Sequence, residues 1–258
     1  MNFVKEFYKN PRRGYGGGVI DVFRKLRDSR CKEPLRPARE QFNGNGSYGN
    51  GGAMRVAPIA LFYHNASIQD VAEMARKSAE ITHTHREGVD GTILQALAIH
   101  QALNVQTDTE LDAQQFVAEL QRKMSSIENG DEFDDAQPYG QKLKEISRLL
   151  SIQPSDEQIQ NVLGTDVSAL RSVPTAIYCF LRGHRDITDI QSTNPFRRSL
   201  EFAIRLGGDT DTIASMTGAI CGAYYGDSLL SETLLKHCEG SAEIRELADK
   251  LYEASCSK

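Results

Sequence analysis

The sequence predicts an all-α protein, and three observations support that fold class. Apolar residues recur at helical spacing, as in Val19, Phe23 and Leu26, which would share one face of a helix. Ser67 and Ser155 each stand three residues before a side chain that can complete a helix-capping box. The alternation of apolar and polar residues that is typical of strands is not sustained anywhere in the chain.

The predicted helices follow one another with short connections. The first comes after the glycine loop at residues 16–18, and another follows Ser67, where Asp70 would complete the cap and Val71, Ala75 and Ile81 form the apolar face. A further helix begins after Ser155 and Gln158. The same periodicity predicts helices over residues 92–103, 111–127, 141–152, 174–181, 196–206, 213–225 and 242–254.

Composition limits the classes of function. The chain has 258 residues, a formal net charge of -5 and 40% hydrophobic residues, which is enough for a core. The negative charge argues against electrostatic binding to nucleic acid or to an anionic membrane. Five scattered cysteines without a CxxC pair favour free thiols in a reducing compartment. With no apolar leader after Met1, we expect a soluble, intracellular protein. No linker rich in Pro or Ser divides the chain, so we expect one domain over residues 1–258, and we expect a monomer.

The most informative segment is GGDTDT, residues 207–212. Two glycines permit a sharp turn, and Asp209, Asp211 and Thr212 then bring oxygen atoms to the entrance of a helix. Carboxylate and hydroxyl oxygens are the ligands that hard cations such as Mg²⁺ and Ca²⁺ prefer. The alternative is that Asp211 is only a helix N-cap. Because two acids so close together repel without a counter-charge, the sequence favours a metal site.

Two other patterns have structural explanations. The acidic residues Asp131, Glu132, Asp134 and Asp135 are interpreted as a solvated loop rather than a metal site. In the helix after GGDTDT, small residues recur every four positions, which predicts close packing by a neighbouring helix. These small residues are Ala214, Gly218, Gly222 and Gly226.

A second loop, residues 42–52, contains glycine at about every second position. Such loops leave backbone N–H groups uncovered and form anion sites, so a phosphate could bind there, with a helix expected to start near Ala53. Ser47 and Asn50 add hydrogen-bonding groups, and Phe42 and Tyr48 offer flat faces for a base. The alternative is an ordinary glycine-rich turn. His83, at the end of a predicted helix, is assigned a ligand contact rather than proton transfer.

Four stretches together resemble the ADP-ribosylglycohydrolase family. They are RGYGGGV at residues 13–19, QFNGNGSYGNGGAMR at 41–55, SVPTAIYCFLR at 172–182 and LGGDTDTIASMTGAICGAYYG at 206–226. The resemblance implies an orthogonal bundle of many helices with two Mg²⁺ ions in a cleft. It also implies hydrolysis of O-glycosidic ADP-ribose linkages, to serine or within poly(ADP-ribose), in the nucleus, the cytoplasm or the mitochondrial matrix. The implied partners are ADP-ribose, ADP-ribosylated proteins and the polymer.

The resemblance also implies site residues. Asp209, Asp211 and Thr212 match metal-ligand positions of the family. The remaining matches are to substrate-binding positions: Ser47, Tyr48, Gly49 and Asn50 for the diphosphate and ribose, Phe42 and His83 near the adenosine and distal ribose, Gly14 and Gly18 in a loop lining the same cleft, and Val167 against adenine.

Two elements of the family are not found. The G-D-x-x-G and T-D-D-T elements supply the other metal ligands and the catalytic glutamate, so the chain would hold only part of the Mg²⁺ ligands and its catalytic residue is unknown. Residues 107–109, 134–135 and 226–228 only approximate these patterns. We therefore expect an N-terminally incomplete domain, either a fragment or incomplete gene model or a real shortened product, with severely impaired activity. The other hypotheses are a non-catalytic ADP-ribose-binding module and a structural protein like the crystallin relatives.

Overall fold

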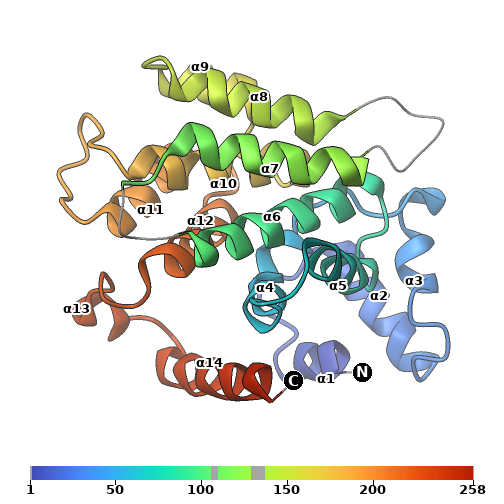
Figure 1. The fold of residues 1–258 in the computed structure, drawn as a ribbon. Helices are drawn as coiled ribbons and strands as arrows, with labels where there is room; N and C mark the ends of the chain where they lie inside the picture. The colour runs from blue at the N-terminus through green and yellow to red at the C-terminus, as the bar shows by residue number, and fades with distance from the viewer. Residues whose placement is uncertain (1, 106–109, 129–136, 258) are drawn as a thin grey trace.

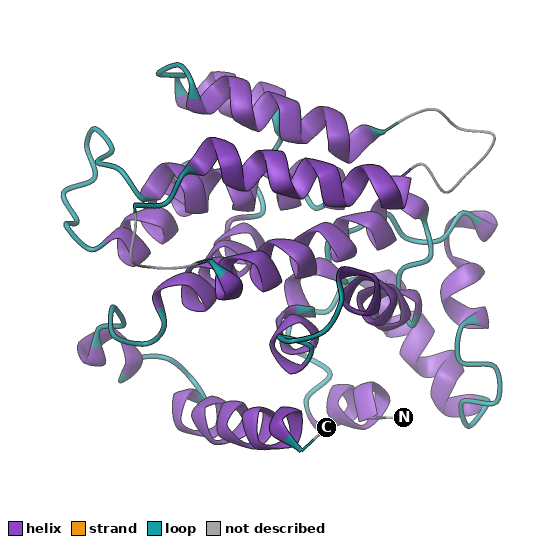
Figure 2. Ribbon diagram, in the orientation of Figure 1, coloured by secondary structure: helices purple, strands orange, loops and turns teal. Residues whose placement is uncertain are grey.

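The computed structural model describes residues 2–105, 110–128 and 137–257, and in those residues it contains helices and loops but no strand (Figure 2). The prediction of an all-α fold is therefore confirmed. None of the helices in this part of the chain is long and apolar enough to cross a membrane. The α-helices are α1 (Asn2–Lys9), α2 (Gly17–Asp28), α3 (Arg36–Arg39), α4 (Ala57–Phe62), α5 (Ile68–Glu80), α6 (Arg86–Asn104), α7 (Ala113–Glu128), α8 (Pro138–Leu150), α9 (Asp156–Val162), α10 (Ala169–Gly183), α11 (Pro195–Arg205), α12 (Thr210–Tyr225), α13 (Glu232–Leu235) and α14 (Ser241–Cys256), with short 3₁₀ turns at Gln41–Gly44 and Ala53–Arg55.

Both predicted helix caps form. The Oγ of Ser67 accepts a hydrogen bond from the Asp70 N–H at 3.1 Å, and α5 begins at the next residue. The Oγ of Ser155 accepts one from the Gln158 N–H at 3.2 Å, while the Gln158 side chain accepts one from the Ser155 N–H at 2.9 Å. This reciprocal capping box satisfies N–H groups that have no partner within α9, and it fixes where the helix starts.

Several helix starts differ from the prediction, including those of α8, at Pro138 rather than residue 141, and α12, at Thr210 rather than residue 213. Helix α10 begins at Ala169 rather than at Pro174, because the Ala169 N–H is held at 3.0 Å by the carbonyl of Tyr48 and the first turn forms there. Helix α6 begins at Arg86 rather than at residue 92, since the His85 ring caps it by accepting from the Glu87 N–H at 3.2 Å. The helix expected near Ala53 is a short 3₁₀ turn, and α4 follows it.

Helix α6 is the centre of the fold (Figure 1). All of its residues from 88 to 102 are buried. It packs against α4, α5, α7, α10 and α12, and these helices enclose it on every side. A helix buried all round needs apolar or paired side chains on every face. For this reason α6 has no single apolar stripe in the sequence.

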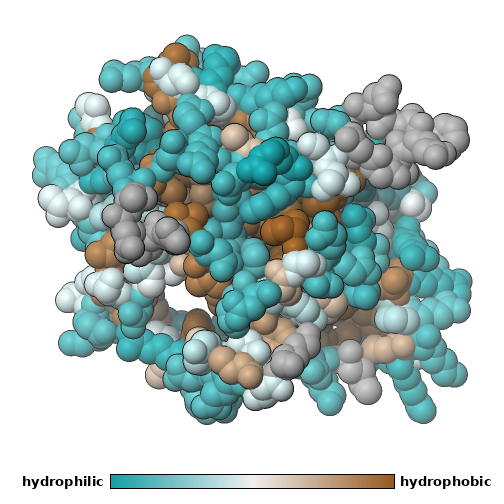
Figure 3. Space-filling model, in the orientation of Figure 1, coloured by the Kyte–Doolittle hydropathy of each residue, from teal (hydrophilic) through white to brown (hydrophobic). Residues whose placement is uncertain are grey.

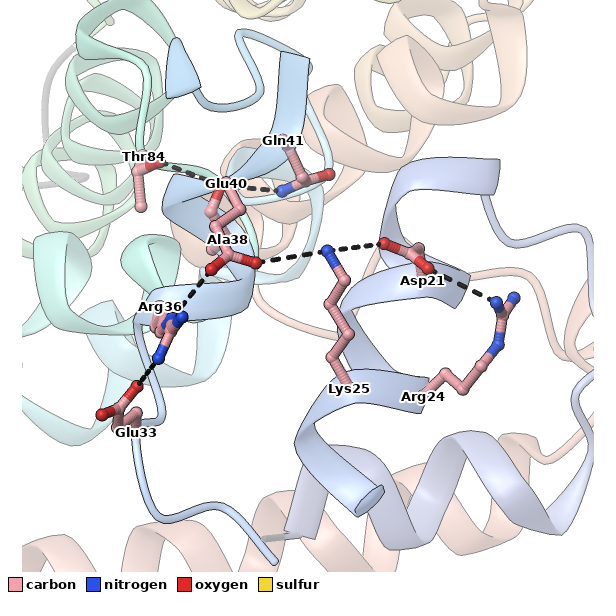
Figure 4. Close-up of polar contacts among 9 residues, drawn as sticks. All are labelled: Asp21, Arg24, Lys25, Glu33, Arg36, Ala38, Glu40, Gln41 and Thr84. Atoms are coloured by element: carbon pink, nitrogen blue, oxygen red, sulfur yellow. Dashed lines mark hydrogen bonds and ion pairs between the residues drawn. The ribbon is translucent and has the colours of Figure 1, made fainter. Parts of the chain in front are cut away.

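Helices α1 and α2 form a smaller apolar cluster of their own, made of Val4, Phe7, Val22, Phe23 and Leu26. Polar contacts then join α2 to α3 and to the chain beyond it, as Figure 4 shows. The Lys25 Nζ lies 3.2 Å from an Asp21 oxygen and 3.3 Å from a Glu40 oxygen. Exposed ion pairs of this kind contribute only about 0–1 kcal/mol each. The apolar cluster is therefore the larger source of stability in this region.

Helix α14 lies along the lower edge of the molecule beside α4 (Figure 1). It has no buried residue, and Ile244, Leu247 and Tyr252 are 63%, 56% and 67% exposed. Figure 3 shows the face of the molecule that is turned to the viewer in Figure 1. This face is mostly hydrophilic, with hydrophobic side chains gathered towards its middle. Helix α14 therefore adds little to the core.

Among the glycines of the small-residue stripe of α12, only Gly218 is in close contact with a neighbouring helix. A Cβ built at Gly218 would lie 3.4 Å from Leu200 of α11, as the packing prediction requires. At Gly222 a Cβ would meet nothing within 4 Å, and Gly226 ends the helix with a φ of 68°. The prediction is wrong for these two glycines: Gly222 faces open space, and Gly226 serves as a C-cap, for which glycine is the preferred residue.

Buried Arg198 holds together the loop that follows α10. Its side chain donates to the carbonyls of Gly183, Ser192 and His184 at 2.8, 2.9 and 3.1 Å, and the residue is only 5% exposed. We expect Arg198→Met to lower the free energy of unfolding by about 3 kcal/mol, because it leaves buried acceptors without donors. Urea unfolding of the two chains measures the difference.

The neighbouring residue provides the control. Arg197 is exposed, and its Nε lies 2.6 Å from a Glu201 oxygen, a pair of the type that contributes little. Arg197→Met should cost less than about 0.5 kcal/mol. Equal losses for the two variants would contradict the role assigned to Arg198.

The carboxyl of Asp90 on α6 should make stability depend on pH. Burial raises its pKa to about 6, and the charges of Arg76 and Arg86 oppose this only in part. The folded chain therefore holds this proton more tightly than the unfolded chain, whose aspartate pKa is about 3.9. The free energy of unfolding should fall as pH rises from about 4 to 6, by roughly 2–3 kcal/mol in total, and stay lower above that range.

Asp90→Asn tests this prediction, because it removes the charge while keeping the size of the side chain. Unfolding by urea between about pH 4.5 and pH 8 should show a smaller loss of stability for the variant than for the parent. Exposed Asp227 offers the matched control, since Asp227→Asn should leave the profile unchanged. Identical profiles for the parent and Asp90→Asn would show that another group causes any pH dependence.

Candidate functional site

The glycine-rich loop has an unusual backbone. Phe42 and Asn43 have positive φ values of 49° and 57°, and Gly44 and Gly46 follow with 93° and 73°. Only glycine adopts this region without strain, so the two non-glycine residues are held there by their surroundings. No residue with a side chain fits at position 46, because a Cβ there would lie 2.2 Å from the Thr84 Oγ1.

The aromatic residues of this loop form an exposed group. Phe42 is 56% exposed and Tyr48 46% exposed, and their ring centroids are 6.0 Å apart. The ring of His85 lies 5.9 Å from that of Tyr48, edge to face. Exposed flat rings can stack on another planar group. The structure therefore brings together Phe42 and Tyr48, as the sequence analysis expects.

The loop is fixed to the segment before α10 by strand-like pairing. The Asn50 N–H donates to the Val167 carbonyl at 3.0 Å, and the Ala169 N–H donates to the Tyr48 carbonyl at 3.0 Å. Between these bonds, Gly49 pairs with Ser168. Val167 itself is 62% exposed. The predicted residues Tyr48, Gly49, Asn50 and Val167 are thus neighbours in space.

Ser47 contributes to the loop itself. Its Oγ accepts a hydrogen bond from the Gly49 N–H at 3.3 Å. Because an accepting hydroxyl still has its own proton, Ser47 can donate to a bound ligand as well. The side chain is half-buried.

The GGDTDT segment begins α12 from a tight turn. Gly207 and Gly208 have φ values of 74° and 73°, and the Asp209 N–H donates to the Thr165 carbonyl at 2.7 Å. Asp209, not Asp211, occupies the N-cap position, and its side chain makes no capping hydrogen bond. The alternative interpretation of Asp211 as the N-cap is therefore wrong, because the positive-φ glycines place the helix start two residues earlier. The Asp211 carboxylate accepts from the Thr212 N–H at 2.9 Å and is exposed.

Asn50 connects the glycine-rich loop to the acidic turn. Its Nδ2 donates to the Asp209 Oδ2 at 2.6 Å and to the Ser172 Oγ at 3.1 Å. The Ser172 Oγ in turn donates to the Ser168 carbonyl at 2.7 Å. Asn50 is 6% exposed, so water competes little for these bonds. The two loops, far apart in the sequence, therefore form one site.

His83 lies directly behind the loop and is 3% exposed. A Cβ at Gly51 would lie 3.0 Å from its Nε2, and one at Gly49 would lie 3.5 Å away. Burial and the positive charge of Arg55 lower the pKa of His83 to about 3. The ring is therefore neutral at physiological pH, which agrees with a ligand contact better than with proton transfer.

The two predicted glycines near the start of α2, Gly14 before the helix and Gly18 in its first turn, are placed differently. A Cβ at Gly18 would lie 2.5 Å from the Gln41 Oε1, next to the start of the loop. The Gln41 Nε2 donates to the Thr82 carbonyl at 2.7 Å. It also donates to the Ala38 carbonyl at 3.3 Å, as Figure 4 shows. Gly14 is exposed with a φ of 72°, and its described surroundings do not join it to the loop or to the acidic turn.

The acidic turn has the right chemistry for a hard cation but only part of a coordination shell. Two carboxylates and a hydroxyl, from Asp209, Asp211 and Thr212, are oxygen ligands without nitrogen or sulfur. Among the residues that the structure describes, no group of three or more His, Cys, Asp or Glu side chains could hold a metal ion. The donor type therefore fits Mg²⁺, while the number of carboxylates is smaller than a complete site needs. The predicted solvated acidic loop with Asp131, Glu132, Asp134 and Asp135 lies outside the described residues.

Several residues of the site could not be identified from the sequence. Ser172, Thr165, Gln41, Thr82 and Arg55 all hold site residues in place by hydrogen bonds. Gln41 and Arg55 stand at the two ends of one recognised stretch and Ser172 at the start of another, which is the only signal of them in the sequence.

Comparisons with known proteins show which family the chain resembles. The sequence model of the ADP-ribosylglycohydrolase family matches residues 2–258. The chain is 47% identical to "ADP-ribosylhydrolase ARH3" of Bos taurus over 256 residues, which cover 97% of this chain and 70% of the relative. It is 46% identical to the protein of the same name from Homo sapiens, with the same coverage.

A solved structure is similar as well. The structure named "ADP-ribosylglycohydrolase-related protein complex" has 25% sequence identity and a TM-score of 0.60, and it covers 98% of this chain and 78% of that chain. The similarity thus extends along nearly the whole of the present chain, and it includes both loops of the site.

Proposed function

Because the chain belongs to the ADP-ribosylglycohydrolase family, a family of hydrolases, we propose that its site binds ADP-ribose and serves Mg²⁺-dependent cleavage of O-glycosidic ADP-ribose linkages. The substrates would be ADP-ribosyl-serine in proteins and poly(ADP-ribose). The observation that carries the proposal is the hydrogen bond from Asn50 to Asp209, which joins an anion-binding type of loop to a cation-binding type of turn.

The parts of the ligand can be assigned to parts of the site. The diphosphate and ribose would lie on the uncovered backbone of residues 47–50, with Ser47 as a donor. The adenine would stack against Phe42 and contact Val167, both of which are exposed. His83 would contact the ribose or phosphate oxygens from beneath the loop. Gly18 would keep Gln41 close to that loop, and Gly14 would act only as part of the adjoining chain.

Asp209, Asp211 and Thr212 would hold the metal side of the site. Bound Mg²⁺ would neutralise the two carboxylates and polarise the ribose oxygens. Asn50 would orient the Asp209 carboxylate through the hydrogen bond from its Nδ2. These ligands are only part of those needed for two ions.

The carboxylate that would transfer the proton to the leaving oxygen is not identified in this chain. We therefore expect binding of ADP-ribose by the 258-residue chain but severely impaired turnover. A non-catalytic ADP-ribose-binding module is the second candidate function, and the same Asn50–Asp209 contact favours it. A purely structural role is less well supported, because it does not explain the cluster of oxygen atoms from Asp209, Asp211 and Thr212. A monomer acting in the nucleus, the cytoplasm or the mitochondrial matrix is part of the proposal.

Mass spectrometry of released ADP-ribose tests the proposal directly. The chain is incubated with a serine-ADP-ribosylated peptide or with poly(ADP-ribose), with Mg²⁺ or with a chelator, beside an Asp209→Asn control. We expect product at a rate far below that of the relatives named ADP-ribosylhydrolase ARH3, and none above background for the control. Product at the rate of those relatives would contradict the expected impairment, and the absence of ADP-ribose binding would reject the proposal.

A further inference from the structure

A chain of buried hydrogen bonds ends at His83. The Arg55 Nη2 donates to the Thr82 Oγ1 at 2.8 Å, and the Thr82 Oγ1 lies 2.7 Å from the His83 Nδ1. Thr82 and His83 are 1% and 3% exposed. The three side chains therefore interact with one another rather than with water.

The same guanidinium also fixes the elements on either side of the ring. The Arg55 Nη1 donates to the Gly51 carbonyl at 2.7 Å, and the Nη2 donates to the Ser78 carbonyl at 2.8 Å. Gly51 belongs to the glycine-rich loop and Ser78 to α5. Arg55 thus holds the loop and the helix that leads to His83 at a fixed separation.

The protons in this chain can be counted. A guanidinium has donors only, so the Thr82 Oγ1 must accept from Arg55. The single Thr82 hydroxyl proton is then available for the His83 Nδ1. A neutral imidazole has one N–H, and this ring is neutral because its pKa is lowered to about 3 by burial and by Arg55. If Nδ1 accepts, the proton of the ring is on Nε2.

The Nε2 edge of the ring faces the loop. Gly49 and Gly51 lie against this edge with no side chain in between, since a Cβ at Gly51 would lie 2.9 Å from the Cε1 and 3.0 Å from the Nε2. An N–H at this position would be directed at a ligand held on the loop. An unprotonated nitrogen would instead favour a hydroxyl donor or a cation.

We propose that Arg55 and Thr82 are positioning residues that hold His83 as the Nε2–H tautomer, so that the ring donates a hydrogen bond to an oxygen of a nucleoside diphosphate sugar on the loop. This proposal rests on the proposed function for the identity of the ligand. The Nε2–H tautomer would favour a ligand with an acceptor oxygen, of a phosphate or a ribose, beside the His83 ring. The opposite tautomer, with Nδ1–H donating to Thr82, is the arrangement that it excludes.

Nitrogen chemical shifts of the His83 imidazole, measured by NMR on the ¹⁵N-labelled full chain, distinguish the two tautomers. In the parent chain we expect a protonated Nε2 and an unprotonated Nδ1. Thr82→Val keeps the shape but removes the hydroxyl, and should give a mixture of tautomers with about a tenfold loss of ADP-ribose affinity, or roughly 1.4 kcal/mol. Thr82→Ser restores the hydroxyl and should behave like the parent.

Two results would overturn the proposal: a protonated Nδ1 in the parent chain, or parent-like shifts in Thr82→Val. Arg55→Lys keeps the positive charge but loses the planar guanidinium. If this variant gave the same His83 shifts as the parent chain, Arg55 would have no role in positioning the ring. The shifts are measured without ligand. A chain that failed to bind ADP-ribose would therefore reject the proposed function, and the shifts would still decide the tautomer.

Discussion

Replacing Gly208 with alanine is expected to lower the free energy of unfolding by roughly 3 kcal/mol, the largest effect that any loss of a glycine should have in the acidic turn. Gly208 has a φ of 73°, and a Cβ there would lie 2.0 Å from the Thr165 carbonyl oxygen. That oxygen also accepts the hydrogen bond from the Asp209 N–H at 2.7 Å. A methyl group would thus strain the backbone and break the contact that fixes Asp209.

Gly207 is the matched control for this substitution. Its φ of 74° is almost the same, but a Cβ there would meet nothing within 4 Å. Gly207→Ala should therefore lower the free energy of unfolding only through the strain of a positive φ, by about 1 kcal/mol. Urea unfolding of the two variants beside the parent separates strain from steric overlap. Equal losses would mean that the turn does not pack on Thr165 as the structure shows.

Asn50→Asp is expected to have the largest effect on the site. The substitution replaces a donor 2.6 Å from the Asp209 Oδ2 by a second carboxylate oxygen. Loss of a hydrogen bond to a charged group and repulsion between like charges should together cost about 3 kcal/mol at neutral pH. Because protonation of either carboxylate relieves the repulsion, the loss should be smaller at about pH 5 than at pH 8.

Thermal unfolding and titration with ADP-ribose measure this variant. We expect a lower midpoint and at least about a tenfold loss of affinity. Asn45→Asp is the control, since Asn45 is an exposed residue of the same loop and the chemical change is identical. If Asn50→Asp were as stable as Asn45→Asp at pH 8, the hydrogen bond to Asp209 would not join the two loops.

The sequence predicted the helices best where local signals define them. Capping serines fixed the starts of α5 and α9, and periodicity revealed most of the long helices. The start of α10 was wrong because it depends on a hydrogen bond between Ala169 and Tyr48, 121 residues apart (169 − 48). Short helices such as α3 and α13 were not predicted, since four residues are too few for a periodic pattern.

The sequence supplies candidate site residues one by one, but it does not supply their arrangement in space. Nearly all of the expected residues gather around Asn50 and Val167, whereas Gly14 lies in an exposed turn. Asn50 and Asp209 are 159 residues apart, and no local pattern could reveal their hydrogen bond. The same holds for the contacts of Arg55 and Thr82, which depend on the packing of α5 behind the loop.

Titration calorimetry with ADP-ribose, in the presence and absence of Mg²⁺, tests most directly whether the two loops form one site. If they do, Mg²⁺ should raise the affinity for ADP-ribose, and ADP-ribose should raise the affinity for Mg²⁺ by the same factor. Asp209→Asn should abolish this dependence while the chain stays folded. Binding of equal strength with and without Mg²⁺, or no binding at all, would contradict the account.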